Sequence, residues 1–152
     1  MLNKLSGFLS TIIAPASVEG CPEHTLQLAT AVLLIEVMQS DADSTDEEQA
    51  TILNILKERF HLSDAEVAKL SELGHRTATA ANDLHQFTSL INRELELSEK
   101  VRIIEYMWQV AYADGAVDAH ENHVISRIAG LLHVTHGEYI AAKLHAKQAA
   151  GL

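Results

Sequence analysis

Two short acidic segments carry the side chains of this sequence that are best suited to chemistry. The first runs from Asp41 to Glu48 and holds five carboxylates in eight residues. The second runs from Asp114 to Glu121, and an offset of 73 residues places Asp41 on Asp114 and Glu48 on Glu121. Carboxylates that converge on a turn suit a hard divalent cation such as Ca²⁺ or Mg²⁺, which prefers oxygen ligands. We call these segments the first and second acidic corners.

A structural role explains the same residues equally well. Glu48 and Glu121 each stand three residues after a residue that can begin a helix, as in a capping box, and acids favour helix N-termini through the helix dipole. An EF-hand is excluded, because its twelfth loop position would be Ile52 or Ile125 instead of glutamate, and the glycine of position six is missing.

Two further carboxylates interrupt apolar stretches. Glu36 stands in Leu-Ile-Glu-Val-Met and Glu105 in Ile-Ile-Glu-Tyr-Met. A carboxylate in such a setting is either buried with partners or lies on a thin exposed edge of its helix. The candidate metal ligands are therefore these two residues with the corner acids: Glu36, Asp41, Asp43, Glu48, Glu105, Asp114 and Glu121.

Other candidate chemistry is weaker. His120 and His123 around Glu121 lack the i, i+4 spacing of a zinc-protease helix, while His133 and His136 offer at most an opportunistic zinc site. Two Glu-x-x-His strings begin at Glu58 and Glu72, but one lies at the end of its helix and the other well inside the next, so we expect no di-iron site. Cys21 has no orienting third group, and no phosphate-binding glycine loop is present. We expect no enzyme activity and no bound organic cofactor.

Helical periodicity dominates the chain. Residues 23–40 and 98–113 are apolar almost all round and read as two central helices, with Thr25 and Ser98 as N-caps. Capping boxes then start helices at 45, 63, 118 and 135, and another helix is expected near 82–94. No segment alternates with period two. The fold class is all-α: a compact bundle of about seven or eight helices in two pseudo-twofold-related halves.

The length of 152 residues fits one core. We expect an N-terminal helix over 2–13 with a loop over 14–22, followed by a single helical domain over 23–150. The start resembles a signal peptide only weakly, and no apolar run could span a bilayer. With a single cysteine the chain fits a reducing compartment, and we expect a cytoplasmic protein.

Charge narrows the class of partner. Eleven basic residues against 21 acidic ones give a net charge of −10, which argues against nucleic acid and favours cations or basic protein surfaces.

The run Tyr-Ala-Asp-Gly-x-x-Asp-x-x-Glu from Tyr112 to Glu121, together with Leu34 to Val37 and Asp83 to Thr88, resembles the TerB family of tellurite-resistance proteins. The likeness covers about residues 23–148. The fold of this family is shared by the N-terminal region of a membrane-anchored DnaJ-type co-chaperone. The resemblance implies a helical domain in stress-response complexes that binds metal through acids, at positions here of Glu36, Asp41, Glu48, Asp114 and Glu121. The first corner departs from this pattern, because Ala42 stands where the second has Gly115.

Three hypotheses follow from the sequence. The first is a non-enzymatic binding module in which a divalent cation, Ca²⁺ or Mg²⁺ before Zn²⁺, modulates docking to a protein partner in a metal or tellurite stress response. The second is a purely structural or scaffolding domain, for example a homodimer, whose acids only cap helices. The third is a metal-dependent hydrolase that uses Glu36 or Glu105.

Overall fold

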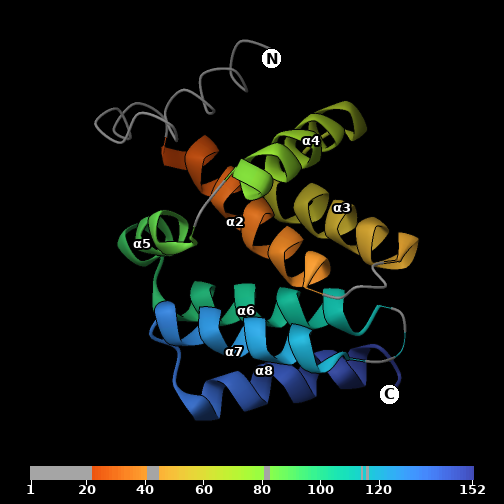
Figure 1. Cartoon of the computed structure of the whole chain (residues 1–152), viewed down its shortest axis with the longest axis vertical. Helices are drawn as coiled ribbons and strands as arrows, with labels where there is room; N and C mark the ends of the chain where they lie inside the picture. Colours follow the sequence, from red (N-terminus) through yellow and green to blue (C-terminus); the bar gives the residue numbers. More distant parts are fainter. Residues whose placement is uncertain (1–21, 41–44, 81–82, 114, 116) are drawn as a thin grey trace.

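The computed structural model describes residues 22–40, 45–80, 83–113, 115 and 117–152. In these ranges the chain forms seven helices and no strand (Figure 1). They are α2 (Pro22–Gln39), α3 (Asp46–Phe60), α4 (Asp64–Ala80), α5 (His85–Glu94), α6 (Leu97–Ala111), α7 (Ala119–Leu131) and α8 (His136–Ala149). The prediction of an all-α bundle is confirmed, while the expected helix over 2–13 lies outside the described residues.

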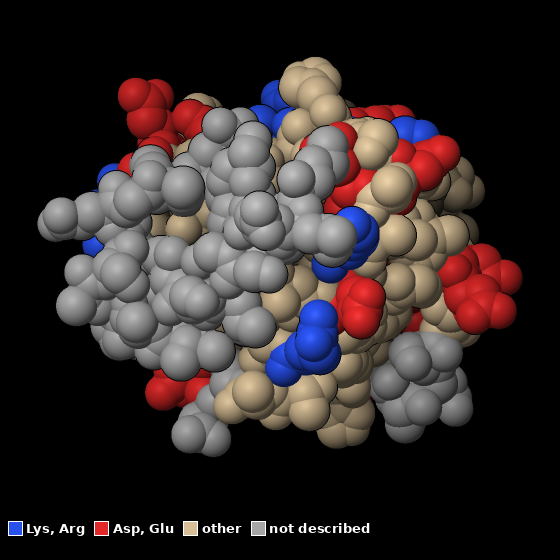
Figure 2. Space-filling model, turned by 90° about the horizontal axis from the view of Figure 1, so that it is seen from above, with Lys and Arg blue, Asp and Glu red and all other residues tan. Residues whose placement is uncertain are grey.

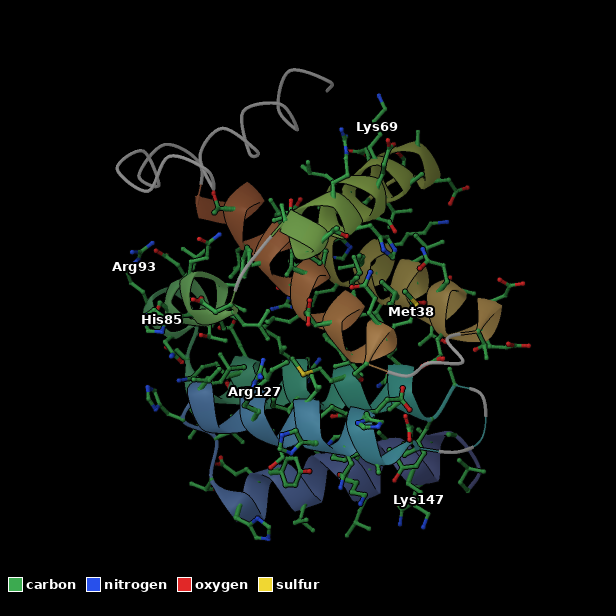
Figure 3. All side chains as sticks on the ribbon, viewed as in Figure 1. Met38, Lys69, His85, Arg93, Arg127 and Lys147 are labelled. Atoms are coloured by element: carbon green, nitrogen blue, oxygen red, sulfur yellow. The ribbon has the colours of Figure 1, made fainter. Side chains whose placement is uncertain are left out.

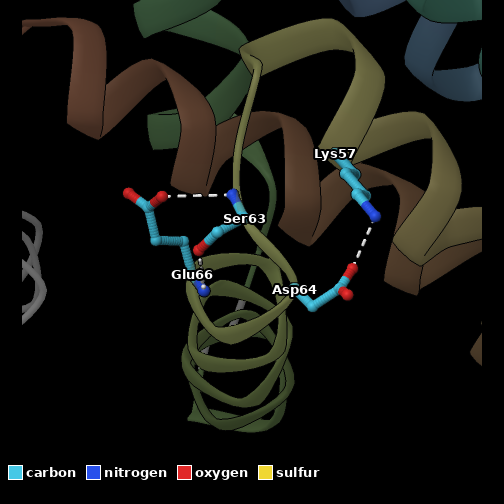
Figure 4. Close-up of polar contacts among 4 residues, drawn as sticks. All are labelled: Lys57, Ser63, Asp64 and Glu66. Carbon is cyan, nitrogen blue, oxygen red and sulfur yellow. Dashed lines mark hydrogen bonds and ion pairs between the residues drawn. The ribbon is translucent and has the colours of Figure 1, made fainter.

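The predicted capping boxes set most of the helix starts. Thr45, Ser63 and Thr135 each accept a hydrogen bond from the backbone N–H three residues on, and the glutamate there accepts one in return. The Ser63 box is drawn in Figure 4, where the neighbouring Lys57 also reaches Asp64 across the α3–α4 turn, with 2.5 Å between Nζ and Oδ1.

Two predicted caps are wrong. α2 begins three residues before Thr25, and α6 begins at Leu97 with Glu96 as its N-cap, so Thr25 and Ser98 both lie within their helices. In α2 the first helical residue is Pro22, whose fixed φ and missing N–H suit a helix start.

Helices α3 and α7 end in the same way, with a histidine in the left-handed conformation. His61 has φ 55° and His133 has φ 61°. In each case the next backbone N–H bonds back into the helix, from Leu62 to the Lys57 carbonyl and from Val134 to the Ala129 carbonyl, both at 3.0 Å. The two histidines are therefore parts of helix terminations.

Helix α2 is the centre of the molecule. It contacts α3, α4, α5, α6 and α7, and nearly every side chain described on it is buried. Its closest neighbour is α4, where Gly74 lies against Ile35 and Ala31 so tightly that an added Cβ would stand 2.8 Å from the Ile35 Cδ1 atom. The expectation of a helix without a polar face holds for this helix.

Helix α6 contacts α2, α3, α7 and α8, but the expectation that it is apolar almost all round is wrong. Its buried side includes Ile103, Ile104, Met107 and Trp108, whereas a polar stripe is exposed or half-buried: Arg102, Glu105, Tyr106 and Gln109. On the buried side it packs with α8, where the Trp108 ring lies 5.4 Å from that of Tyr139 and 5.0 Å from the Lys143 Nζ atom.

The helices form two groups in Figure 1. α6, α7 and α8 lie stacked with roughly parallel axes in the lower part of the view, while α2, α3 and α4 lie above them at oblique angles and α5 lies at one side. Among the helices described, none is both long and apolar enough to cross a membrane.

Candidate functional site

The described part of the first acidic corner is the start of α3. Glu48 is fully buried, and its Oε1 atom accepts a hydrogen bond from the Thr45 backbone N–H at 3.0 Å. The Glu48 backbone N–H in turn donates to the Thr45 hydroxyl oxygen at 3.2 Å. This capping box holds the carboxylate in one orientation, so the prediction of a capping role for Glu48 is confirmed.

Capping accounts for only half of this carboxylate. The Oε2 atom of Glu48 is buried and has no hydrogen-bond donor among the residues that the structure describes. A buried polar atom without a partner is costly, and a carboxylate oxygen more so than a neutral one. A carboxylate oxygen in this state can accept a hydrogen bond from a further donor or coordinate a cation.

The second corner has the same local build. Glu121 is fully buried at the third position of α7, and its Oε1 atom accepts from the Asp118 backbone N–H at 3.0 Å. Ile52 and Ile125, which the 73-residue offset pairs, are both fully buried one turn further on. The two corners thus share a capped, buried glutamate followed by a buried isoleucine.

Both corners lie at the same end of the molecule. In Figure 1 the end of α2, the start of α3, the end of α6 and the start of α7 all lie toward the right-hand side. The ion pair between Arg59, near the end of α3, and Glu99, near the start of α6, fits this antiparallel arrangement. Asp41, Asp43 and Asp114 fall outside the described residues, and their candidacy stays a prediction from the sequence.

Glu36 on α2 is half-buried. It is neither fully buried with partners nor on an exposed edge of its helix, the two alternatives that the sequence left open. Burial raises the pKa of the Glu36 carboxyl above its ordinary value, and the positive charge of Arg127 partly offsets this effect. Arg127 comes from α7 (Figure 3). The positive charge of Arg127 on α7 thus acts on the Glu36 carboxyl of α2, without a hydrogen bond or ion pair between the two side chains.

Glu105 on α6 has a different partner. Its Oε1 atom lies 2.5 Å from the Nδ1 atom of His145 on α8, and the two side chains are 21% and 69% exposed. The pair joins α6 to α8 near the surface. Glu36 and Glu105 therefore have different surroundings: Glu105 pairs with a residue of α8, whereas Glu36 feels only the charge of a residue on α7.

Within the described ranges, no three side chains of the His, Cys, Asp and Glu types lie together in a way that could hold a metal ion. Of the seven predicted ligands, the four that are described are Glu36, Glu48, Glu105 and Glu121, and they do not converge. Any complete metal site at the corners would need the loop acids that precede Thr45 and Asp118 in the sequence.

One polar network beside the first corner was not predicted. The amide nitrogen of Gln49 donates to the Ser71 hydroxyl at 3.1 Å, and its amide oxygen lies 3.2 Å from the His75 Nε2 atom. Burial lowers the pKa of His75, because a charged imidazole is less well solvated there. The network joins α3 to α4 immediately after Glu48, but partners 22 and 26 residues apart have no sequence spacing that signals them.

A buried lysine was also missed. Lys100 is only 9% exposed, and its Nζ atom lies 3.2 Å from the Asn92 amide oxygen. Asn92 donates in turn to the Leu131 carbonyl at 2.9 Å. This chain of contacts links α6, α5 and the end of α7, which gives Lys100 a structural role.

Comparison with known families identifies this architecture. The family model described as tellurite resistance protein TerB matches residues 27–144, which includes both corners and most of the bundle. The chain belongs to the TerB family. The resemblance predicted from the Tyr112–Glu121 run is thereby confirmed. Searches of curated proteins and of solved structures found no match.

Proposed function

We propose that this TerB-family protein is a non-enzymatic binding module of the cytoplasm, in which a divalent cation at the acidic corners modulates docking to a protein partner. Family membership links the chain to tellurite resistance. The cation, the partner and the part played in a metal or tellurite stress response are our proposal.

The buried, half-satisfied carboxylate of Glu48 carries the proposal. One oxygen is held by the capping box, which fixes the side chain, and the other has no donor among the described residues. A fixed carboxylate oxygen is the ligand type that Ca²⁺ and Mg²⁺ prefer, and the sequence places two more carboxylates, Asp41 and Asp43, a few residues before Glu48. A bound cation would balance the charge that burial otherwise leaves costly.

The charge of the molecule supports the partner side of the proposal. The chain carries a net charge of −10, and in Figure 2 its acidic side chains lie in several separate groups around the face shown. Such a surface attracts cations and basic protein patches. A cation bound at the corners would reduce the local negative charge, and so change the affinity for a basic partner.

A thermal melt of the chelator-treated protein tests the cation directly, with Ca²⁺, Mg²⁺, Mn²⁺ and Zn²⁺ added in turn. A cation at about a hundred times its dissociation constant should add about 2.7 kcal/mol of stability, which raises the melting temperature by several degrees in a domain of this size. The rise should be lost in Glu48→Gln and in the double variant Asp41→Asn, Asp114→Asn.

Glu138→Gln is the matched control. Glu138 occupies the same capping-box position at the start of α8, where its Oε1 atom accepts from the Thr135 N–H at 3.2 Å, but no acidic loop precedes it. The control should keep the full response to the cation. A flat response of the wild type to every ion, or equal losses in Glu48→Gln and Glu138→Gln, would leave the corners as helix caps only.

A further inference from the structure

A concave surface lies between the second half of α3 and the middle of α6, two helices that contact each other. Its volume of about 350 Å³ lies within the range of small-molecule sites. It is separate from Glu48, because its α3 residues are in the last two turns of that helix and at its C-cap. We call it the α3–α6 cleft.

The α6 wall of the cleft presents three polar side chains on one helix face. Arg102, Tyr106 and Gln109 follow each other at i, i+4 and i+7. Among the described residues, none forms a hydrogen bond or an ion pair with any of these three side chains. A guanidinium, a hydroxyl and an amide therefore line one wall with their donors available.

The α3 wall supplies an apolar surface and more charge. Ile55 is 6% exposed and gives the cleft its buried apolar part. Arg59 also lines it, and its Nη2 atom lies 3.4 Å from the Glu99 carboxylate, so its charge is partly compensated. Glu58 and His61 complete this wall.

We propose that the α3–α6 cleft binds a small organic anion through its phosphate or carboxylate group. Arg102 is a cation with no anionic partner in the described part of a chain whose net charge is −10, and charge-assisted hydrogen bonds from arginine to such groups are strong and directional. Tyr106 and Gln109 add neutral donors on the same face. Glu58 would accept a hydrogen bond from a hydroxyl or amino group on the same ligand.

The concavity and the charge balance favour a small molecule over a macromolecule. A phosphate-rich polymer needs an extended basic surface, whereas Arg59 and Arg102 here share their cleft with Glu58, and Arg59 is already paired with Glu99. A single phosphate or carboxylate group fits this mixture of charges, because it needs only one unpaired cation, here Arg102, and a few neutral donors, here Tyr106 and Gln109.

The test is a titration of the full-length, ¹⁵N-labelled protein followed by NMR, in the presence of chelator so that the result is independent of any cation at the corners. The probes are inorganic phosphate and malonate, with sodium chloride at equal ionic strength as the reference. We expect saturable shifts of the Gln109 side-chain amide and of residues around Tyr106 with at least one probe. A response to phosphate alone or to malonate alone identifies which oxyanion the cleft prefers.

Arg102→Gln should weaken this binding about tenfold or more, because a charge-assisted contact is lost, and Tyr106→Phe should weaken it less. The matched control is Arg76→Gln, which removes the same charge from an exposed arginine on α4 whose ion pair is with Glu72 at 3.8 Å. Arg102 is exposed, so its replacement should leave the spectrum of the folded protein intact. Shifts no larger than those with chloride, or equal weakening in Arg102→Gln and Arg76→Gln, would overturn the proposal.

Discussion

Helices α2 and α6 come from equivalent positions of a duplicated sequence pattern, yet one is the core and the other carries a surface. At the 73-residue offset, each polar residue that lines the α3–α6 cleft from α6 has a counterpart on α2. The pairs are Arg102 with Ala29, Tyr106 with Leu33, and Gln109 with Glu36. Ala29 and Leu33 are fully buried, whereas Arg102 is exposed and Tyr106 half-buried.

The difference follows from what covers each helix. α2 is surrounded by α3, α4, α5, α6 and α7, and α5 has no counterpart in the second half of the chain. α6 packs with α2, α3, α7 and α8 but keeps a polar edge toward the end of α3. α2 is thus enclosed on more sides than α6, and the candidate ligand-binding residues occur on the edge of α6 that stays uncovered.

Exchanging one pair of residues between the two helices gives the largest expected effect. Ala29→Arg would bury a guanidinium with no partner at a fully buried position, and should cost about 4 kcal/mol or more, enough to unfold the domain. The reciprocal Arg102→Ala, on the exposed edge, should change stability by about 0.5 kcal/mol or less. Chemical denaturation followed by circular dichroism measures both, and similar losses would show that α6 is as enclosed as α2.

Local sequence rules accounted for most of the fold. Each capping box predicts its helix start from residues only three positions apart, as Thr45 and Glu48 do, because the interaction is local. The polar edge of α6 was not predicted, because the apolar residues Ile103, Ile104, Met107 and Trp108 dominate the pattern. Whether the residues between them are buried depends on which helices pack there, and this is not a local property.

The candidate site was predictable to the same extent. Glu36 and Glu105 were recognised as unusual because each interrupts an apolar run. The residues that interact with them could not be predicted from the sequence, since His145 lies 40 residues from Glu105 and no spacing links Arg127 to Glu36. For the same reason, only the structure shows that the Oε2 atom of Glu48 is buried without a hydrogen-bond donor among the described residues.

A smaller effect is expected where α4 covers α2. Gly74→Ala would place a methyl group 2.8 Å from the Ile35 Cδ1 atom and 3.3 Å from the Ala31 Cβ atom. The strain of overpacking should exceed the helix propensity gained, with a net loss of about 1 kcal/mol. Gly130→Ala in α7, where an added Cβ meets nothing within 4 Å, should instead gain about 0.5–1 kcal/mol. A stabilised Gly74→Ala in urea denaturation would mean that the packing of α4 on α2 accommodates an added methyl group, contrary to the tight approach of Gly74 to Ile35.

The smallest effects concern the acid on each helix, and they should differ in sign. Because burial raises the pKa of the Glu36 carboxyl, the folded state holds the proton more tightly than the unfolded state does. This contribution to stability is complete below the ordinary value of about 4.5 and is lost as the pH rises through the raised pKa. Glu36→Gln should therefore stabilise the protein at neutral pH, by less than about 1 kcal/mol because the group is partly solvated and Arg127 opposes the shift. The gain should shrink toward pH 4.

Glu105→Gln removes the ion pair that Glu105 forms with His145, and should lower stability by less than about 1 kcal/mol while the imidazole is protonated. Melting temperatures of both variants across the acidic range decide the comparison. If Glu36→Gln lowered stability at neutral pH, the attraction between the Glu36 carboxylate and the Arg127 charge would outweigh the cost of burying that carboxylate. The acids on α2 and α6 would then be equivalent inter-helix ion pairs, and the enclosure of α2 would have no electrostatic consequence at this position.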